Sequence, residues 1–252
     1  MCPELWVHII FGGLSTLFPS IRICVINWRY MTERLQKAYL YLKEAFNKSE
    51  YYKKPENSER KRYRIEHSIR VCKAGLKIAE CEGFDEEHKE AIQVACLLHD
   101  IGYSIDRLQE ENDMKNHGPE GAKLVQPFLE SLGYSGKLLE DMIFGIPIHQ
   151  SGKTDIEGDR NSFSLTVANA DDIDRFGSYK TALSLERSNI SKMEHQERLN
   201  FICDKIGYYN WHLKNQEYGT ETAKKIITEE IALQIKFYQA LSDQEYITFG
   251  EE

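Results

Sequence analysis

The 252-residue chain has 41% hydrophobic and 29% charged residues, which is typical of one substantial globular domain and excludes a disordered chain. Its formal net charge of -8 lacks the basic excess that neutralises a phosphate backbone, so we expect no nucleic-acid partner. Six scattered cysteines without a CxxC pair exclude a secreted disulfide scaffold and a cysteine-rich zinc site, and they favour a cytoplasmic location.

The first thirty residues are the most apolar part of the chain. His8, Pro19 and Arg22 interrupt this stretch before it reaches the roughly 20 clean residues that a membrane-spanning helix needs. Met31 then opens a conventional amphipathic pattern. We therefore expect residues 1–30 to be a dispensable extension, with no stable membrane association.

From Met31 onward, apolar residues recur at three- and four-residue spacing, and no convincing strand pattern is bounded by turn signals. The chain is therefore predicted to be all-α. Gly83 before the potential cap Asp85, and Gly219 before the last helix, mark helix boundaries. Helices are expected at 32–47, 60–82, 86–99, 119–132, 136–149, 162–176, 179–187, 192–216 and 221–242, with a polar loop at 150–161.

An apolar helical segment, 91–98, ends in the adjacent pair His99 and Asp100. A buried carboxylate must be paired, hydrogen-bonded or metal-bound, and a neutral imidazole can donate a nitrogen to the same cation. Alone, the doublet is weak evidence, because the two side chains can simply bond to each other. Its meaning depends on other ligand types along the chain.

Two further helices carry such residue types. His67 lies on a predicted helix with a core-facing apolar pattern. Asp171 and Asp174 are three residues apart in the helix predicted at 162–176 and therefore share a face. One carboxylate can bind a metal there while the other supports a ligand or contacts substrate.

These segments resemble the HD-domain superfamily of metal-dependent phosphohydrolases, whose signature is a histidine, a His-Asp doublet and a distant aspartate in a helix reading Ala-Asp-x-Leu-Asp. The resemblance covers residues 60–180 and implies an HD-domain helical bundle. A helix and linker at 31–59 would precede it, and additional C-terminal helices at 181–252 would pack on it. It implies that the core metal ligands are His67, His99, Asp100 and Asp171.

Two more histidines, His117 and His149, resemble the extra ligands of dinuclear family members, in which the doublet's aspartate bridges two cations. A mixed nitrogen and oxygen ligand set suits one or two Mn, Fe, Co, Ni or Zn ions better than Mg or Ca alone. The expected activity is hydrolysis of a phosphate monoester or diester in a nucleotide or other small phosphorylated metabolite. Metal-activated water would be the nucleophile, oriented by Asp100.

Candidates for substrate contact are Arg64, one turn before His67, Lys153 in the polar loop, Asp174 and Arg175. One position departs from the family pattern. Many hydrolytic relatives carry a lysine shortly after the doublet, where this chain has Tyr103. A cation that could face a phosphate is therefore missing from that position.

Two alternatives remain open at the level of sequence. A few superfamily members use the same ligand order to hold two irons and act as oxygenases. A regulatory protein could also use the fold only to bind a nucleotide. Such a protein would be expected to lose metal ligands, whereas this chain has a suitable residue at all six ligand positions. The C-terminal helices could pack on the core, wall the pocket or form a homodimer interface.

Overall fold

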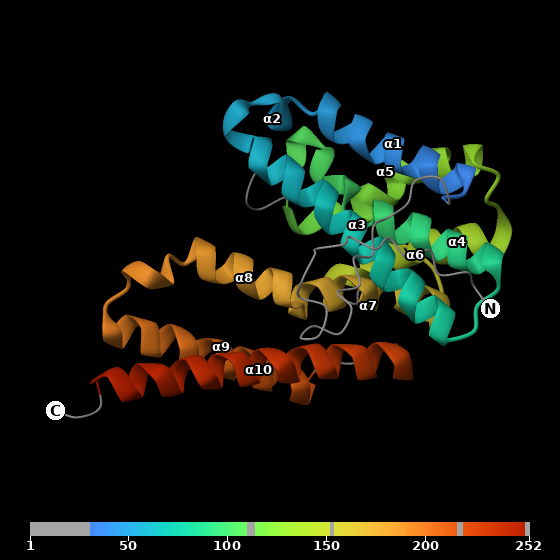
Figure 1. Ribbon diagram of the computed structural model, residues 1–252. Helices are drawn as coiled ribbons and strands as arrows, with labels where there is room; N and C mark the ends of the chain where they lie inside the picture. Colours follow the sequence, from blue (N-terminus) through green and yellow to red (C-terminus); the bar gives the residue numbers. More distant parts are fainter. Residues whose placement is uncertain (1–30, 110–113, 152–153, 216–218, 250–252) are drawn as a thin grey trace, which may run out of the picture. The chain divides into compact units, whose positions relative to one another are not determined.

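The computed structural model describes residues 31–109, 114–151, 154–215 and 219–249, and this part of the chain contains helices and no strand. The prediction of an all-α fold is confirmed. The α-helices (Figure 1) are α1 (Glu33–Lys48), α2 (Glu50–Lys53), α3 (Ser58–Cys81), α4 (Glu86–Leu98), α5 (His117–Ser131), α6 (Gly136–Ser151), α7 (Ser162–Phe176), α8 (Ser178–Arg187), α9 (His195–Asn215) and α10 (Glu221–Phe249).

The helix boundaries follow the local chemistry. The Asp85 side chain accepts a hydrogen bond from the His88 amide at the start of α4, as its position predicted. The Thr220 hydroxyl does the same for the Ala223 amide at the start of α10. Gly83 follows α3 with a φ of 75°, a left-handed conformation that favours glycine and ends the helix.

Several segments differ from the predicted helices, and α10, for example, runs to Phe249 rather than to residue 242. α5 begins at His117 rather than at residue 119, because a proline in the first turn needs no backbone donor. The helix expected at 192–216 begins later, as α9 at His195, because a 3-10 turn at Ile190–Lys192 and the extended residue Met193 precede it. The short helix α2 and a 3-10 turn at Ile101–Ser104 were not anticipated.

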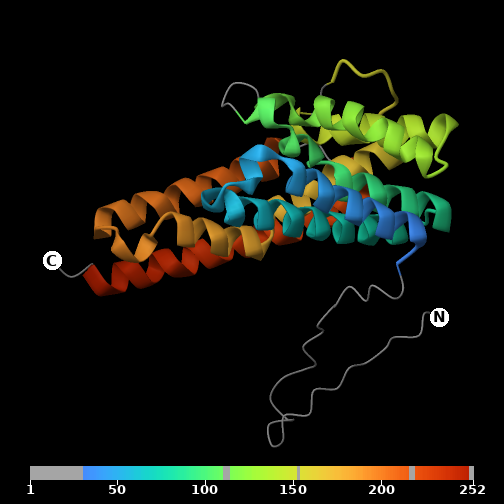
Figure 2. The same cartoon turned by 90° about the horizontal axis from the view of Figure 1, so that it is seen from above.

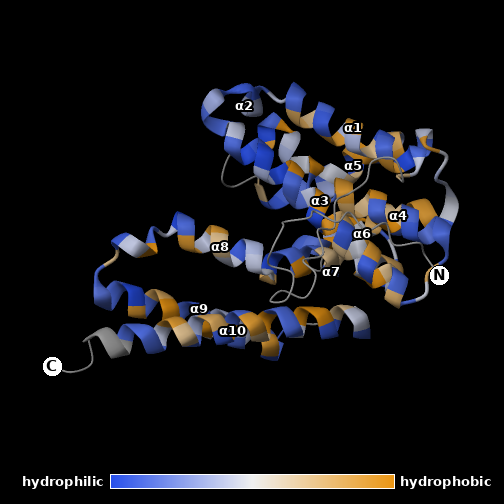
Figure 3. Ribbon diagram, in the orientation of Figure 1, coloured by the Kyte–Doolittle hydropathy of each residue, from blue (hydrophilic) through white to orange (hydrophobic). Residues whose placement is uncertain are grey.

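Helix α4 lies at the centre of the bundle and packs against α1, α3, α6 and α7. Every residue from Ala91 to Leu98 except Gln93 is buried. Figure 3 shows the apolar character of α4 and its neighbour α6. Each large apolar side chain contributes roughly 1.5–3 kcal/mol on burial, so the end of α4, where the His-Asp doublet follows, is held firmly inside the core.

Helices α8, α9 and α10 lie together beside α7 (Figures 1 and 2). α9 and α10 pack along each other, and α10 also packs on α7. Their apolar faces form one cluster with the end of α7, in which Phe176, Tyr209 and Tyr238 are the largest buried side chains. Within the described ranges, no helix combines the length and the apolar character that crossing a membrane requires.

Candidate metal centre

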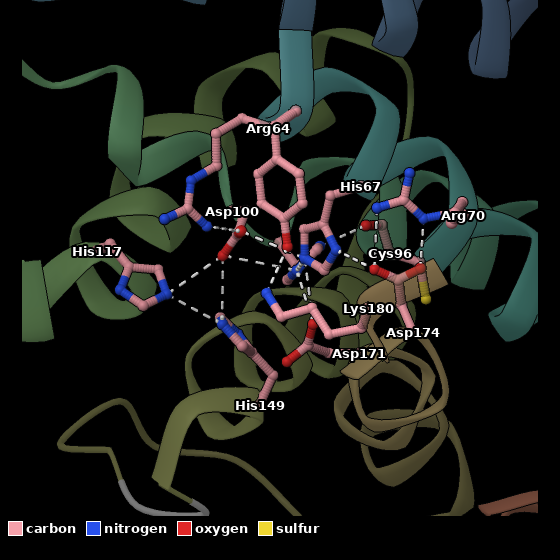
Figure 4. A network of polar contacts seen from close by, with 12 residues as sticks. Arg64, His67, Arg70, Cys96, Asp100, His117, His149, Asp171, Asp174 and Lys180 are labelled. Carbon is pink, nitrogen blue, oxygen red and sulfur yellow. Dashed lines mark hydrogen bonds and ion pairs between the residues drawn. The ribbon is translucent and has the colours of Figure 1, made fainter. Parts of the chain in front are cut away.

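The structure brings together all six predicted ligand residues from five helical segments, and Figure 4 labels five of them: His67, Asp100, His117, His149 and Asp171. The shared partner is Asp100, directly after α4. Its Oδ1 lies 3.3 Å from His117 Nε2, 3.5 Å from His149 Nε2 and 3.6 Å from His99 Nε2. Its Oδ2 lies 3.4 Å from His67 Nε2.

Two groups of potential ligand atoms meet at this carboxylate. One contains His67, His99 and Asp100, and the other contains Asp100, His117 and His149. Asp171 Oδ1, on α7, joins the first group at 3.1 Å from His67 Nε2 and 3.7 Å from His99 Nε2. Asp100 belongs to both groups and would be the shared ligand if each group held a cation.

Three of the four histidines are oriented in the same way. Nδ1 of His99 donates to the Cys96 carbonyl at 2.7 Å, and Nδ1 of His117 donates to the Met114 carbonyl at 2.7 Å. His149 bonds the Ile146 carbonyl in the same manner. In each case the acceptor is the backbone oxygen three residues earlier, so Nδ1 carries the proton and Nε2 presents a lone pair to the centre.

These residues fit a cation. The Nε2 atoms of His67 and His99 lie 3.2 Å apart, and those of His117 and His149 lie 3.0 Å apart. Two lone pairs at such a distance repel each other unless a proton or a metal ion lies between them. A set of imidazole nitrogens and carboxylate oxygens suits a divalent transition metal.

Burial and charge act together on the acidic groups. Burial alone would raise the pKa of Asp100, but the charges of His99 and Arg64 outweigh it and hold that pKa well below its usual range. Burial would also raise the pKa of Asp171, and the neighbouring imidazoles of His67 and His99 hold it well below the usual range. Both carboxylates are therefore available as anionic ligands at neutral pH.

The comparison with known families agrees with this geometry. Residues 64–188 match the family model of the HD domain. The chain contains an HD domain. The resemblance inferred from the motif is thereby confirmed, and it supports a metal-dependent hydrolase in general, since HD domains bind divalent metals. The assignment of each residue as a ligand stays a prediction.

One crystal structure shares this fold. It belongs to a protein described as a predicted HD superfamily hydrolase from an uncultured Thermotogales bacterium. The two structures align with a TM-score of 0.53 and 19% sequence identity, over 84% of this chain and 92% of the other. No curated protein matches the chain significantly.

His67 of the HD domain is anchored by a carboxylate rather than by a carbonyl. Its Nδ1 donates to Asp174 Oδ2 at 2.7 Å. Asp174 in turn accepts hydrogen bonds from Nε and Nη2 of Arg70, the latter at 3.1 Å. Asp174 therefore acts on the centre through His67, and it belongs to neither of the two ligand groups.

Arg64 and Tyr103 form a stack beside the doublet. The Arg64 guanidinium lies 3.5 Å from the centroid of the Tyr103 ring, and the other side of the stack continues to His117, whose ring centroid is 4.1 Å from that of Tyr103. Arg64 Nη1 also donates to Asp100 Oδ2 at 2.8 Å. The cation missing from position 103 is thus present next to the doublet, on a different helix.

A close backbone approach joins the doublet to the start of α5. A Cβ atom placed on Gly102 would lie 2.0 Å from the carbonyl oxygen of His117. Only glycine allows the turn after the doublet to pack against α5 at this distance. The glycine thereby brings His117 within reach of Asp100.

A pocket of about 390 Å³ opens onto the centre. Arg64 and Arg175 line it, as substrate contact would require, and Arg175 Nε donates to the Tyr208 hydroxyl at 3.1 Å. Lys153 lies outside the described residues. Helices α8 and α9 also line the pocket, with Lys180, Ser184, Lys205, Tyr208 and Tyr209. The sequence motifs did not indicate this contribution, because these lysines and tyrosines resemble ordinary solvated or core residues in the sequence.

Proposed function

We propose that the protein is a metal-dependent phosphohydrolase that cleaves a phosphate ester of a nucleotide or another small phosphorylated metabolite by attack of activated water. The observation that carries the proposal is the sharing of Asp100 by two ligand groups at the base of a cation-lined pocket. An overall acidic protein needs such a local concentration of positive charge to bind an anion.

The chain's own residues prepare the site for this chemistry. Divalent ions at the two groups would supply Lewis-acid polarisation of the phosphate and acidify a water molecule. Asp100 would link the two groups, because His67 faces its Oδ2 while His117 and His149 face its Oδ1. Arg64, fixed by Tyr103 and paired with Asp100, keeps that carboxylate oriented and ionised.

Substrate binding would use the open side of the pocket. Arg175 lines it and offers N–H donors to phosphate oxygens. The aromatic rings of Tyr63 and Tyr208 line it too and would exclude water from the remaining part of the substrate. These residues would bind and orient the ester. The attacking water would lose a proton, and the leaving alkoxide would gain one.

The test is release of inorganic phosphate under anaerobic conditions, with Mn²⁺ or Fe²⁺, from a panel of nucleotides and small phosphate esters. Asp100→Asn should lower phosphate release by more than about 100-fold, since even partners behind a metal ligand cost 10–100-fold when removed. Asp243→Asn, an exposed aspartate on α10, is the matched control and should behave as wild type.

Other outcomes point elsewhere. Oxygen consumption with ferrous iron, and no phosphate release from any compound, would replace the proposal by the di-iron oxygenase. Tight nucleotide binding without turnover by the metal-loaded protein would replace it by a regulatory binding protein.

A further inference from the structure

Two lysines from the C-terminal helices line the same pocket as the ligand residues. Lys180 of α8 lies beside the ligand cluster (Figure 4), and its Nζ donates to the Tyr63 hydroxyl at 2.7 Å. Nζ of Lys205, on α9, lies 5.1 Å from the centroid of the Phe201 ring. Both lysines are half-buried, so packing holds them in the pocket wall.

No carboxylate balances either ammonium within the described part of the chain. Lysines elsewhere, such as Lys89 and Lys137, pair with an acidic side chain within 4.0 Å, whereas the recorded partner of the Lys180 ammonium is a phenol. Burial lowers the pKa of Lys205, and the neighbouring charge of Lys180 lowers it further. Two partly desolvated like charges cost free energy that a bound anion would offset.

With divalent ions at the two ligand groups, the pocket would carry more positive charge than one phosphate monoester can neutralise. Four cationic side chains line it. Arg64 pairs with Asp100 and Arg175 pairs with Asp172, whereas neither lysine has a carboxylate partner among the described residues. Asp100 and Asp171 would be taken up by metal ions, which add still more positive charge. A phosphate monoester supplies only about two negative charges at neutral pH.

We propose that Lys180 and Lys205 form a second phosphate subsite, and that the substrate is a small molecule with two separate phosphate groups. The inference rests on the proposed hydrolase for the fate of the first phosphate. At the ligand groups, a water oxygen bonds to phosphorus, the ester P–O bond breaks, and a water proton passes to the leaving alkoxide. The second phosphate stays on the product and serves only for binding.

Matched pairs of compounds test the subsite: adenosine 3′,5′-bisphosphate against adenosine 5′-monophosphate, and fructose 1,6-bisphosphate against fructose 6-phosphate. For Mn²⁺-loaded protein, KM and kcat are measured where a compound is hydrolysed, and Kd by calorimetry where it is not. Wild type should prefer the bisphosphate of at least one pair by about tenfold or more, because hydrogen bonds to charged groups are among the stronger ones.

Lys180→Met and Lys205→Met should each weaken binding of the bisphosphate of that pair by about tenfold. Binding of the corresponding monophosphate should stay within about threefold of wild type. Lys180→Arg and Lys205→Arg should retain most of the preference, since they keep the charge. The control is Lys214→Met, which removes an exposed lysine of α9 outside the pocket and should change neither compound. Thermal melts check that each variant is folded.

Equal binding of both members of each pair by wild type would overturn the second subsite. An equal loss for both members in the lysine variants would also overturn it, because the lysines would then serve the phosphate that is cleaved. Failure of the hydrolase proposal would give a different result, because no phosphate would then be released from any compound. The ratio of the Kd values for bisphosphate and monophosphate would still test the role of the lysines.

Discussion

The histidines of the centre obtain their orientation from two different kinds of acceptor. Backbone carbonyls hold His99, His117 and His149, whereas the charged pair of Asp174 and Arg70 holds His67. A carboxylate partner makes an imidazole a stronger donor to a metal than a carbonyl does. His67 is therefore the ligand whose strength depends most on a side chain outside the ligand set.

Asp174→Asn should weaken metal binding by about 10–100-fold, because the amide keeps an acceptor for His67 but loses the negative charge. Arg70 would also be left without its ionic partner. Calorimetric titration of the metal-free protein with Mn²⁺ measures the effect, and Asp243→Asn serves as the exposed control. An unchanged affinity in a folded variant would mean that Asp174 does not act through His67.

At the scale of elements, a single glycine sets how the doublet meets α5. Gly102 follows the buried end of α4, and its missing side chain leaves space for the carbonyl of His117. Backbone atoms cannot move aside as a flexible side chain can. The start of α5, and with it the second ligand group, therefore depends on this contact.

Gly102→Ala should lower the free energy of unfolding by about 3 kcal/mol and should displace His117, because overpacking forces the backbone apart. Urea unfolding and the number of metal ions bound per chain measure the two effects. Gly207→Ala is the opposite case: nothing lies within 4 Å of its added Cβ in α9, so it should stabilise the helix by roughly 0.5–1 kcal/mol. Full metal occupancy in Gly102→Ala would contradict the proposed role of the contact.

At the scale of the whole molecule, the centre links metal binding, pH and stability. Burial opposes a charge on His67, but hydrogen bonds with Asp100, Asp171 and Asp174 outweigh it and hold the pKa of His67 well above 6.5 in the absence of metal. A raised pKa in the folded state contributes stability that is complete below the unfolded value and is lost as pH rises through the folded value.

The metal-free protein should therefore lose stability as pH rises above about 6.5, the value for an unperturbed histidine. Metal binding needs the deprotonated imidazole, so metal affinity should rise over the same range. The gain in Tm on adding Mn²⁺ should consequently grow with pH. The low pKa values of Asp100 and Asp171 act at the acid end, where their contribution is lost as pH falls through them.

Thermal melts with Mn²⁺ or with a chelator, at pH values from about 6 to about 8.5, measure this gain around the histidine pKa. In Asp100→Asn, which removes the residue common to both ligand groups, the gain should be small at every pH. A gain in wild type that stays constant or shrinks as pH rises would show that no histidine proton is released when metal binds.

The sequence by itself determined the helical class and the metal-ligand residue types. Three- and four-residue spacing is a local property that a helix displays directly, and a His-Asp pair after an apolar run is unusual enough to stand out. The order of the ligands along the chain then indicated the family. The first two signals lie within a few helical turns and the third is an order along the chain, so no tertiary contact was needed to detect any of them.

The tertiary structure decided which of the remaining charged side chains face the site. Lys180 and Tyr63 are 117 positions apart, yet they share a hydrogen bond in the pocket wall. The sequence places Lys180 on an amphipathic helix, where a lysine normally points into solvent. Whether such a face meets water or a pocket depends on how α8 and α9 pack beside α7, and helical periodicity carries no information about that packing.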